Sequence, residues 1–169
     1  MNRDFTLLYQ KYKEPIFSYI YYLSRDYTEA EEICQDVFLK VYLNIAKFEG
    51  RSSFKTWIYC IAKNTFLEFK RKTKKEILIE EFHTIENSFN VNIDTPEDHV
   101  LQIESQDLIK KVLARMNDKY RNFIILRDIQ ELSYQEISEI TGIKLNTVKV
   151  NIYRARREFQ SVYKELEGM

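Results

Sequence analysis

The chain has 169 residues and 26 basic and 26 acidic side chains, so its formal net charge is zero. Glycine and proline are scarce, with three and two residues, which favours helices over a turn-rich β fold. The longest apolar stretch, Ile16–Leu23, is too short to span a membrane, and no signal peptide precedes it, which indicates a cytoplasmic protein. We expect an all-α protein of one domain or two small ones.

Charge is unevenly distributed along the chain. Residues 1–75 carry a net charge of +5, residues 76–106 carry −8 with no basic residue, and residues 107–169 carry +3. Two basic modules joined by an acidic connector predict two contacts with nucleic acid and a segment between them that stays off the DNA.

The N-terminal segment predicts two amphipathic helices before residue 49. Apolar residues recur at helical spacing from Phe5 to Leu23, and Pro15 is expected to end, kink or restart the helix. Thr28 followed by Glu31 predicts a capping box that starts the second helix. The inward stripe of this helix is predicted to be Ala30, Ile33, Cys34, Val37, Phe38, Val41, Ile45 and Phe48.

A third helix is predicted from about Phe54 to about Lys70, after a break at residues 49–53. Aromatic and basic residues alternate along it, as expected where unstacked bases meet a phosphate backbone. A solvated basic helix end has the same composition, and Trp57 is equally consistent with a place in the core.

Residues 76–103 lose the helical periodicity and predict a mostly extended acidic linker, with helical pieces near Ile77–Phe82. Helices are predicted again from Glu104, with a cap at Asn117 and Asp118 between two of them.

The two cysteines and two histidines lack the close spacing of a zinc site, so we expect no metal and no cofactor. No phosphate-binding glycine loop or nucleophile–base grouping is visible, so we expect no enzymatic activity.

The C-terminal segment SYQEISEITGIKLNTVKVNIYRARREF, residues 133–159, predicts a helix-turn-helix. Ser133 and Glu136 form a capping box, Gly142 suits the turn, and Asn146 is a good N-cap for the second helix. An ordinary helix pair with a solvated basic face has the same periodicity, but the tight turn and the arginines favour DNA binding. The second helix is predicted to turn Val148, Ile152, Ala155 and Phe159 inward and Thr147, Lys149, Val150, Asn151, Tyr153, Arg154 and Arg157 outward.

The segments AEEICQDVFLKVY, FEGRSSFKTWIYCIAKNTFLEFKRK and LSYQEISEITGIKLNTVKVNIYRAR, in this order around an acidic linker, resemble bacterial RNA polymerase sigma factors. The short form is similar to the extracytoplasmic-function (ECF) class, and the resemblance covers nearly the whole chain. It implies an all-α fold with a region 2-like domain at 1–75, a flexible acidic linker at 76–103 and a region 4-like domain at 104–169. It also implies a non-enzymatic subunit that binds core polymerase and directs promoter-specific transcription initiation.

The resemblance implies three sets of binding residues. The helix around residues 35–40 matches the segment that docks on the polymerase clamp helices, and the polymerase flap is a second implied partner. Residues 48–71 match the element that reads and melts the minus-ten region, where the loop 49–53 holds a flipped base. The implied residues are Gln35, Asp36, Leu39 and Lys40 for polymerase; Phe48, Arg51, Ser53, Lys55, Trp57, Lys63, Asn64, Lys70 and Arg71 for the minus-ten element; and Lys144, Asn146, Thr147, Lys149, Val150, Tyr153, Arg154 and Arg157 for the minus-thirty-five element.

Two departures and one alternative remain. Val150 and Asn151 replace the usual Ser-Arg, so promoter preference cannot be copied from relatives, and Ile58 stands where primary sigma factors often have a second Trp.

An anti-sigma factor, often membrane-anchored in this class, is an implied partner, whereas no small-molecule substrate is. The alternative is a helix-turn-helix regulator that acts without polymerase, which would bind duplex DNA alone and prefer symmetric half-sites.

Overall fold

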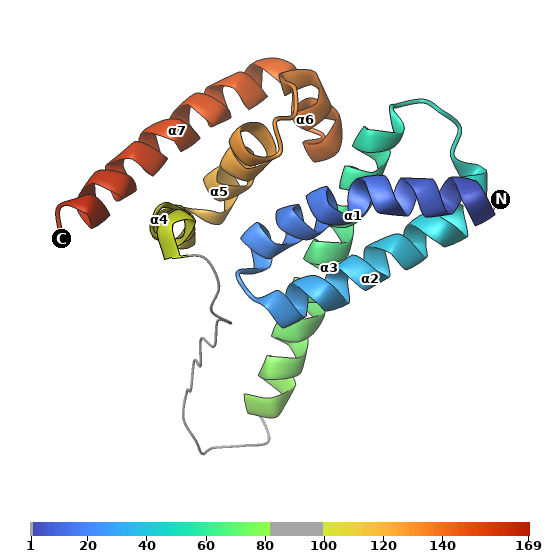
Figure 1. The fold of residues 1–169 in the computed structure, drawn as a ribbon, viewed down its shortest axis with the longest axis horizontal. Helices are drawn as coiled ribbons and strands as arrows, with labels where there is room; N and C mark the ends of the chain where they lie inside the picture. The colour runs from blue at the N-terminus through green and yellow to red at the C-terminus, as the bar shows by residue number, and fades with distance from the viewer. Residues whose placement is uncertain (1, 82–99) are drawn as a thin grey trace.

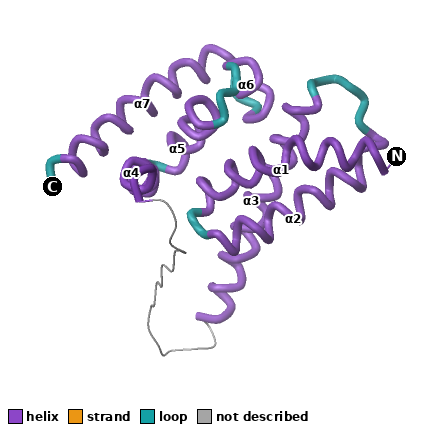
Figure 2. The backbone as a smooth tube through the Cα atoms, in the orientation of Figure 1, coloured by secondary structure: helices purple, strands orange, loops and turns teal. Residues whose placement is uncertain are grey.

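The structure, a computed structural model, describes residues 2–81 and 100–169. Every regular element in these ranges is a helix (Figures 1 and 2), which confirms the all-α prediction. The elements are α1 (Asn2–Ser24), α2 (Tyr27–Asn44), the 3-10 turn η1 (Ile45–Lys47), α3 (Phe54–Glu81), α4 (Val100–Arg115), α5 (Asp118–Ile124), the π-helical turn η2 (Ile125–Ile129), α6 (Tyr134–Thr141) and α7 (Leu145–Glu167).

Helices α1, α2 and α3 form an N-terminal bundle (Figure 1). The carboxylate of Asp26 accepts a hydrogen bond from the backbone N–H of Glu29 at 2.8 Å and caps α2. The predicted capping box of Thr28 and Glu31 is therefore wrong, because Asp26 begins the helix two residues earlier. The predicted inward residues of α2 from Ala30 to Val41 are all buried, so the stripe itself is confirmed.

Pro15 lies inside α1, which neither ends nor restarts there. A proline in a helix interior removes one hydrogen bond and costs about 3 kcal/mol or more. On both sides of Pro15 the helix buries Tyr12, Ile16 and Tyr19. Because a fully buried large apolar side chain gains about 1.5–3 kcal/mol, packing on α2 and α3 outweighs the proline.

The helices around the acidic segment are longer than predicted. Helix α3 ends at Glu81 instead of near Lys70, and α4 begins at Val100 instead of Glu104. The run of Lys and Glu after residue 70 has a high helix propensity, which explains the extension of α3. The predicted linker, residues 76–103, therefore overlaps the ends of both helices, and its part at 82–99 lies outside the described residues together with both histidines.

Helices α4 to α7 form a second bundle, in which α7 packs on both α4 and α5. Asn117 caps α5 as predicted, since its side-chain oxygen accepts the N–H two residues on at 3.0 Å. The buried Arg121 donates to the backbone carbonyls of Leu113 at 2.7 Å and Met116 at 3.0 Å. Burial lowers the pKa of Arg121, and Asp118 at 2.8 Å opposes this shift. This guanidinium therefore holds the corner between α4 and α5.

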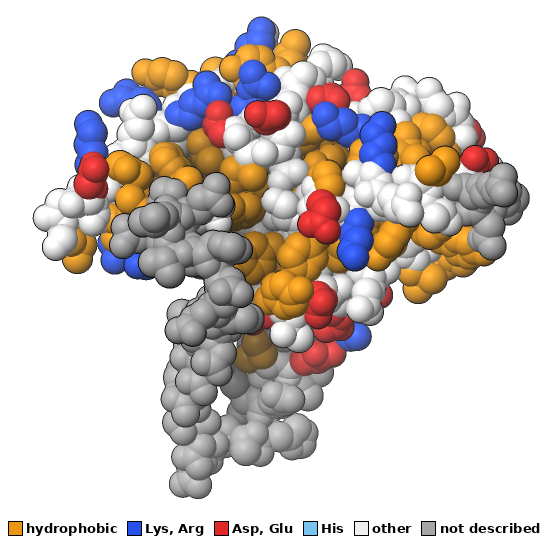
Figure 3. Space-filling view, viewed as in Figure 1, with side chains coloured by type: hydrophobic (Ala, Val, Ile, Leu, Met, Phe, Trp, Pro, Cys, Tyr) orange, Lys and Arg blue, Asp and Glu red, His pale blue; other side chains and the backbone are white. Residues whose placement is uncertain are grey.

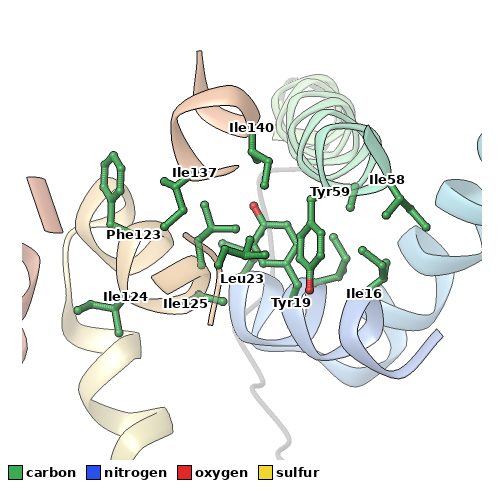
Figure 4. Packing of buried hydrophobic residues seen from close by; sticks show 14 of the residues in the cluster. Ile16, Tyr19, Leu23, Ile58, Tyr59, Phe123, Ile124, Ile125, Ile137 and Ile140 are labelled. Carbon is green, nitrogen blue, oxygen red and sulfur yellow. The ribbon is translucent and has the colours of Figure 1, made fainter. Parts of the chain in front are cut away.

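The two bundles pack against each other through α1 and α3 on one side and η2 and α6 on the other. Figure 4 shows Tyr19 and Tyr59 with Ile16 and Ile58 in one hydrophobic cluster that continues into Ile137 and other residues of the second bundle. We call this contact the interdomain interface. Its polar members are Ser18, Tyr19, Arg25, Lys55, Tyr59 and Cys60 on the first bundle and Ala114, Asn122, Gln130, Glu136 and Glu139 on the second.

Candidate nucleic-acid interface

The turn between α6 and α7 is fixed by local hydrogen bonds. The Ser133 hydroxyl accepts from the N–H of Glu136 at 3.1 Å, and the Glu136 carboxylate accepts from the N–H of Ser133 at 2.7 Å, which confirms the capping box. Gly142 ends α6 at a φ of 70°, a conformation that favours glycine. The Ser138 hydroxyl donates to the carbonyl of Ile143 at 2.6 Å and ties the turn back onto α6. The capping box and the glycine turn of the predicted helix-turn-helix are thus confirmed.

Helix α7 separates a buried stripe from an exposed basic face. Val148, Ile152 and Ala155 are buried as predicted, and Phe159 packs against the core. Figure 3 shows Lys and Arg side chains along the outer edge of α7. All eight residues assigned to the minus-thirty-five set are exposed: Lys144, Asn146, Thr147, Lys149, Val150, Tyr153, Arg154 and Arg157.

The basic residues of this face form no ion pair with any described carboxylate. The Arg157 guanidinium lies 6.0 Å from the Tyr153 ring centroid, and Val150 and Tyr153 are 46% and 63% exposed. An exposed helix face with free cations, an amide and a small apolar side chain can contact phosphates and base edges in a major groove.

Two predictions about α7 are wrong. Lys144, not Asn146, stands at the N-cap, and Asn146 lies in the first turn of the helix. Asn151 is buried at 3% exposure instead of facing outward, and its side-chain nitrogen has no hydrogen-bond partner among the described residues. Asn151 lies between Val148 and Ile152 on the inner side of α7, so it cannot replace the DNA contact that an exposed residue would make.

Arg156 is a basic residue of α7 that does not belong to the exposed set. Its guanidinium donates to both carboxylate oxygens of Asp128, at 2.6 and 3.2 Å, and these hydrogen bonds raise the pKa of Arg156. The pair joins α7 to the π-helical turn η2. Arg156 is therefore a structural arginine beside two free ones, Arg154 and Arg157.

A second candidate surface lies at the loop before α3. The rings of Phe48, Phe54 and Trp57 form a cluster with centroids 5.1–5.7 Å apart. A cavity of about 200 Å³ opens beside it, between the half-buried Trp57 and the loop. Gly50 turns this loop at a φ of 69°, and the Ser53 hydroxyl accepts the N–H of Thr56 at 3.1 Å and caps α3. The cavity is lined by Lys47, Phe48, Glu49, Arg51, Ser52 and Trp57.

Most cations of this second surface have carboxylate partners. Arg51 contacts Glu49 at 2.6 Å, Lys70 contacts Glu29 at 2.6 Å, and Lys55 lies 3.6 Å from Glu136 of α6. Such partly exposed pairs contribute about 0–1 kcal/mol each, so phosphates can compete for these cations. Of the other assigned residues, Asn64 and Arg71 are exposed and Lys63 is half-buried.

A groove of about 340 Å³ between α2 and α3 continues the second surface on the other side of Trp57. Asn64 reaches this groove, and so do Asn44 and Lys47, which the sequence analysis did not assign. The buried hydroxyl of Thr65 lines the groove and has no hydrogen-bond partner within residues 2–81 and 100–169. The sequence analysis did not assign Asn44 and Lys47 to this surface because neither belongs to the loop or to α3. Only the packing of α2 beside α3 brings them to the groove.

The residues assigned to polymerase binding lie beside a hydrophobic groove of about 640 Å³ between α1 and α2. Gln35 and Leu39 line it, Asp36 is exposed on the same helix, and Lys40 is paired with Glu68 at 2.5 Å. Burial raises the pKa of Cys34, at the base of the groove, to about 11. The aromatic lining was not assigned from the sequence: Phe5, Tyr9, Phe17, Tyr27, Phe38 and Tyr42.

No cluster of three or more His, Cys, Asp or Glu side chains suited to a metal ion occurs within residues 2–81 and 100–169. In those two ranges, no helix has the length and apolar character needed to cross a membrane.

The two candidate DNA surfaces coincide with two known sequence families. A family model of sigma-70 region 2 matches residues 8–76, and one of sigma-70 region 4 matches residues 106–159. RNA polymerase sigma factor YlaC of Bacillus subtilis is 33% identical over 153 residues, which cover 90% of this chain and 88% of that protein. ECF RNA polymerase sigma factor SigW of the same organism is 34% identical over 161 residues, which cover 92% and 86%.

Solved structures have the same fold. The sigma factor RpoE in complex with the anti-sigma factor NepR, from Bartonella quintana, superposes with a TM-score of 0.75 at 25% identity, over 96% of this chain and 98% of that one. CnrH in complex with the cytosolic domain of CnrY superposes with a TM-score of 0.73 at 16% identity, over 98% and 90%. Both likenesses extend over the two bundles together.

Proposed function

Because this chain belongs to the ECF class of RNA polymerase sigma factors, we propose that its two bundles contact separate elements of one promoter. As a sigma factor the protein binds core polymerase and directs promoter-specific initiation. We assign residues 1–75 to a region 2 domain, residues 104–169 to a region 4 domain and residues 76–103 to the connection between them. The observation that carries this assignment is a pair of different DNA surfaces, one on each matched region.

The loop 48–53 and α3 would recognise and melt the minus-ten element. A base flipped from the non-template strand fits the cavity beside Trp57, and the aromatic cluster offers a ring on which a base can stack. Flipping costs a few kcal/mol of unstacking, which stacking at about 1–3 kcal/mol per base and phosphate contacts can offset. Lys63 and Arg71 supply these phosphate contacts directly, and Lys55 and Lys70 do so once DNA displaces their carboxylates.

Helix α7 would read the minus-thirty-five element as a duplex. Its N-terminal residues Asn146, Thr147, Lys149 and Val150 are placed to reach base edges, while the arginines further along bind phosphates. Val150 can contact a thymine methyl group but cannot donate a hydrogen bond. Asn151 is buried and takes no part in base readout.

The α1–α2 groove would receive the clamp helices of core polymerase. An amphipathic helix binds such a groove through apolar side chains, and the exposed Leu39 and Tyr42 on its rim, 56% and 53% exposed, would be covered. Gln35 and Asp36 would supply polar contacts at the edge. The flap of the polymerase is the expected partner of the region 4 domain.

Transcription in vitro tests the proposal. Core polymerase with this protein is expected to start transcripts at a defined subset of genomic promoters, mapped by sequencing the 5′ ends. Core polymerase alone is the control. If the protein instead bound symmetric duplex sites alone and left initiation by core polymerase unchanged, it would act as a regulator and the proposal would fail.

We also propose that an anti-sigma factor controls this protein, since the similar RpoE was solved in complex with one. The exposed aromatic groove between α1 and α2 suits such a partner, which would then compete with polymerase. The protein would act in the cytoplasm, at the nucleoid when active, and a membrane-anchored partner would hold it at the membrane. Purification of the inactive complex and identification of its second subunit tests this.

A further inference from the structure

Two hollows of the N-terminal bundle meet at Trp57. One is the loop cavity of about 200 Å³, and the other is the groove of about 340 Å³ between α2 and α3. Among the described residues that line them, Trp57 and Lys47 are the two that border both hollows. The loop cavity has been assigned above to a flipped base, whereas the α2–α3 groove has no assigned ligand.

Lys47 is an exposed cation at the junction of these hollows. It lies in the turn η1 and forms no ion pair with any carboxylate of residues 2–81 and 100–169. In contrast, Arg51 at the loop cavity is paired with Glu49, and Lys40 in the α2–α3 groove is paired with Glu68. A phosphate at the junction would therefore meet a cation that has no carboxylate to release.

The α2–α3 groove combines apolar walls with a few polar groups. Trp57 and Ile61 supply the apolar part, and the exposed Asn64 lies at the groove from α3. The side-chain nitrogen of Asn44 donates to the carbonyl of Lys40 at 2.8 Å, so the side-chain oxygen of Asn44 is left to bind a ligand. A flat base can pack on such walls, and an amide oxygen accepts from the amino group of adenine or cytosine.

Thr65 supplies a second, independent sign of a ligand in this groove. Its side chain is 3% exposed, and its hydroxyl has no hydrogen-bond partner in the part of the chain that the structure describes. Thr73, two turns further along α3, instead donates to the carbonyl of Phe69 at 3.0 Å. A buried hydroxyl without a partner is costly and uncommon in folded proteins. A ligand edge in the groove would supply the missing partner of Thr65.

We propose that the α2–α3 groove is a second base pocket, which takes the nucleotide next to the flipped one, and that Lys47 binds the phosphate between the two. This inference rests on the proposed role of the loop 48–53 in minus-ten recognition. The base in the groove carries an exocyclic amino group, as adenine and cytosine do, because Asn44 offers it an acceptor. Thr65 forms a hydrogen bond with the same base.

Uncharged linkages test the role of Lys47. A methylphosphonate replaces one phosphate at a time in a single-stranded minus-ten oligonucleotide, and fluorescence anisotropy measures its binding to core polymerase that carries this protein. Lys47→Ala should weaken binding of the unmodified oligonucleotide about tenfold, as expected for loss of a hydrogen bond between charged groups. It should also abolish the affinity loss that methylphosphonate causes at one linkage. Lys74→Ala removes an exposed lysine that borders neither hollow, so every methylphosphonate effect should persist in this control.

Persistence of every methylphosphonate effect in Lys47→Ala would overturn the inference. Weaker binding of the Lys47→Ala protein to core polymerase would overturn it as well, since the groove would then belong to the polymerase interface. If the unaltered protein with core polymerase bound no single-stranded minus-ten oligonucleotide, the proposed function of the loop and α3 would itself be wrong.

Thr65→Val tests the base pocket. Valine has nearly the same shape as threonine but no hydroxyl, so the variant loses an unsatisfied buried group and should unfold at a higher temperature. In complex with core polymerase it should nevertheless bind the minus-ten oligonucleotide about threefold to tenfold more weakly, because the base loses a hydrogen bond. Unchanged binding would contradict the inference. A lower unfolding temperature together with weaker binding would show a structural role and would contradict it too.

Base analogues test the predicted amino group. At each nucleotide beside the sensitive linkage, adenine is compared with purine and cytosine with pyrimidinone, which differ from them only by the absence of the amino group. At one of these nucleotides the natural base should bind about threefold to tenfold tighter, and Asn44→Ala should remove the difference. Equal affinities for every pair in the unaltered protein would exclude the amino-group contact and overturn the assignment of the groove.

Discussion

The two proposed DNA surfaces differ in the pairing of their charged side chains. Around the loop 48–53 and α3, Arg51, Lys55 and Lys70 are paired with carboxylates, and the rings of Phe48 and Trp57 line a cavity. In contrast, α7 presents Arg154 and Arg157 without carboxylate partners among the described residues. The loop surface is thus suited to unstacked bases and the α7 surface to the phosphates of a duplex. Promoter melting and salt-dependent binding should therefore respond to different mutations.

The largest effect is expected from Trp57→Ala. Loss of the ring that borders the cavity removes base stacking worth about 1–3 kcal/mol, so promoter melting should fall about tenfold to a hundredfold. Permanganate reactivity of unpaired thymines in the holoenzyme–promoter complex measures this. Tyr153→Ala, which removes an exposed ring from the duplex-reading face, is the matched control and should reduce melting far less. Equal losses in the two variants would remove the distinction between the surfaces.

The next largest effect concerns the free arginines of α7. Replacing Arg154 and Arg157 with Ala should weaken binding of duplex minus-thirty-five DNA about tenfold and reduce the slope of log affinity against log salt by about 2. Arg156→Ala is the control: it breaks the pair with Asp128 and should lower thermal stability without changing the salt slope. A similar slope change in Arg156→Ala would mean that the exposed and paired arginines are not distinct. Titrations at several salt concentrations decide between these outcomes.

A smaller change is expected at Val150. Val150→Ala shortens the apolar side chain that can contact a thymine methyl group, so discrimination for thymine at one position should fall about two- to fivefold. Selection of binding sites from a randomised minus-thirty-five element measures the preference. The unaltered protein and the Val150→Ala variant are assayed in parallel. If the preferred sequence were unaltered, base readout would have to rest on Asn146, Thr147 and Lys149 alone.

The smallest effect is expected from release of a paired cation on the surface around the loop 48–53 and α3. Glu29→Gln leaves Lys70 without its carboxylate and should raise affinity for single-stranded minus-ten DNA by about twofold, because such pairs contribute at most about 1 kcal/mol. Glu32→Gln, an exposed position of the same helix, alters the net charge equally. An equal gain in both variants would show a general charge effect and no competition for Lys70. Fluorescence anisotropy with labelled oligonucleotides has the required sensitivity.

The helices and the helix-turn-helix could be predicted because their signals are local. Ser133, Glu136 and Gly142 lie within ten positions of one another, and each satisfies backbone geometry that does not depend on the rest of the chain. The periodic stripe of α2 was equally clear, since burial of one face imposes the helical spacing directly.

Contacts between distant residues could not be predicted in this way. The partners of Lys55, Lys70 and Arg156 are 28 to 81 positions away, so a basic residue that binds a carboxylate looks the same in the sequence as one that binds DNA. The sequence left the outcome at Pro15 open, because the packing that keeps it within one helix comes from other helices. The interdomain interface had no local signal at all, since its side chains are ordinary core residues of each bundle.

Asn151 has a consequence for the tolerance of the region 4 domain to mutation. A buried amide nitrogen without a partner costs about 1–3 kcal/mol, so this domain is less stable than its own packing would allow. Because of this cost in folding stability, the small domain is closer to its unfolding threshold and withstands fewer additional substitutions. If α7 reads the minus-thirty-five element as proposed, an apolar residue at position 151 would let the domain tolerate a wider range of substitutions on the exposed face of this helix.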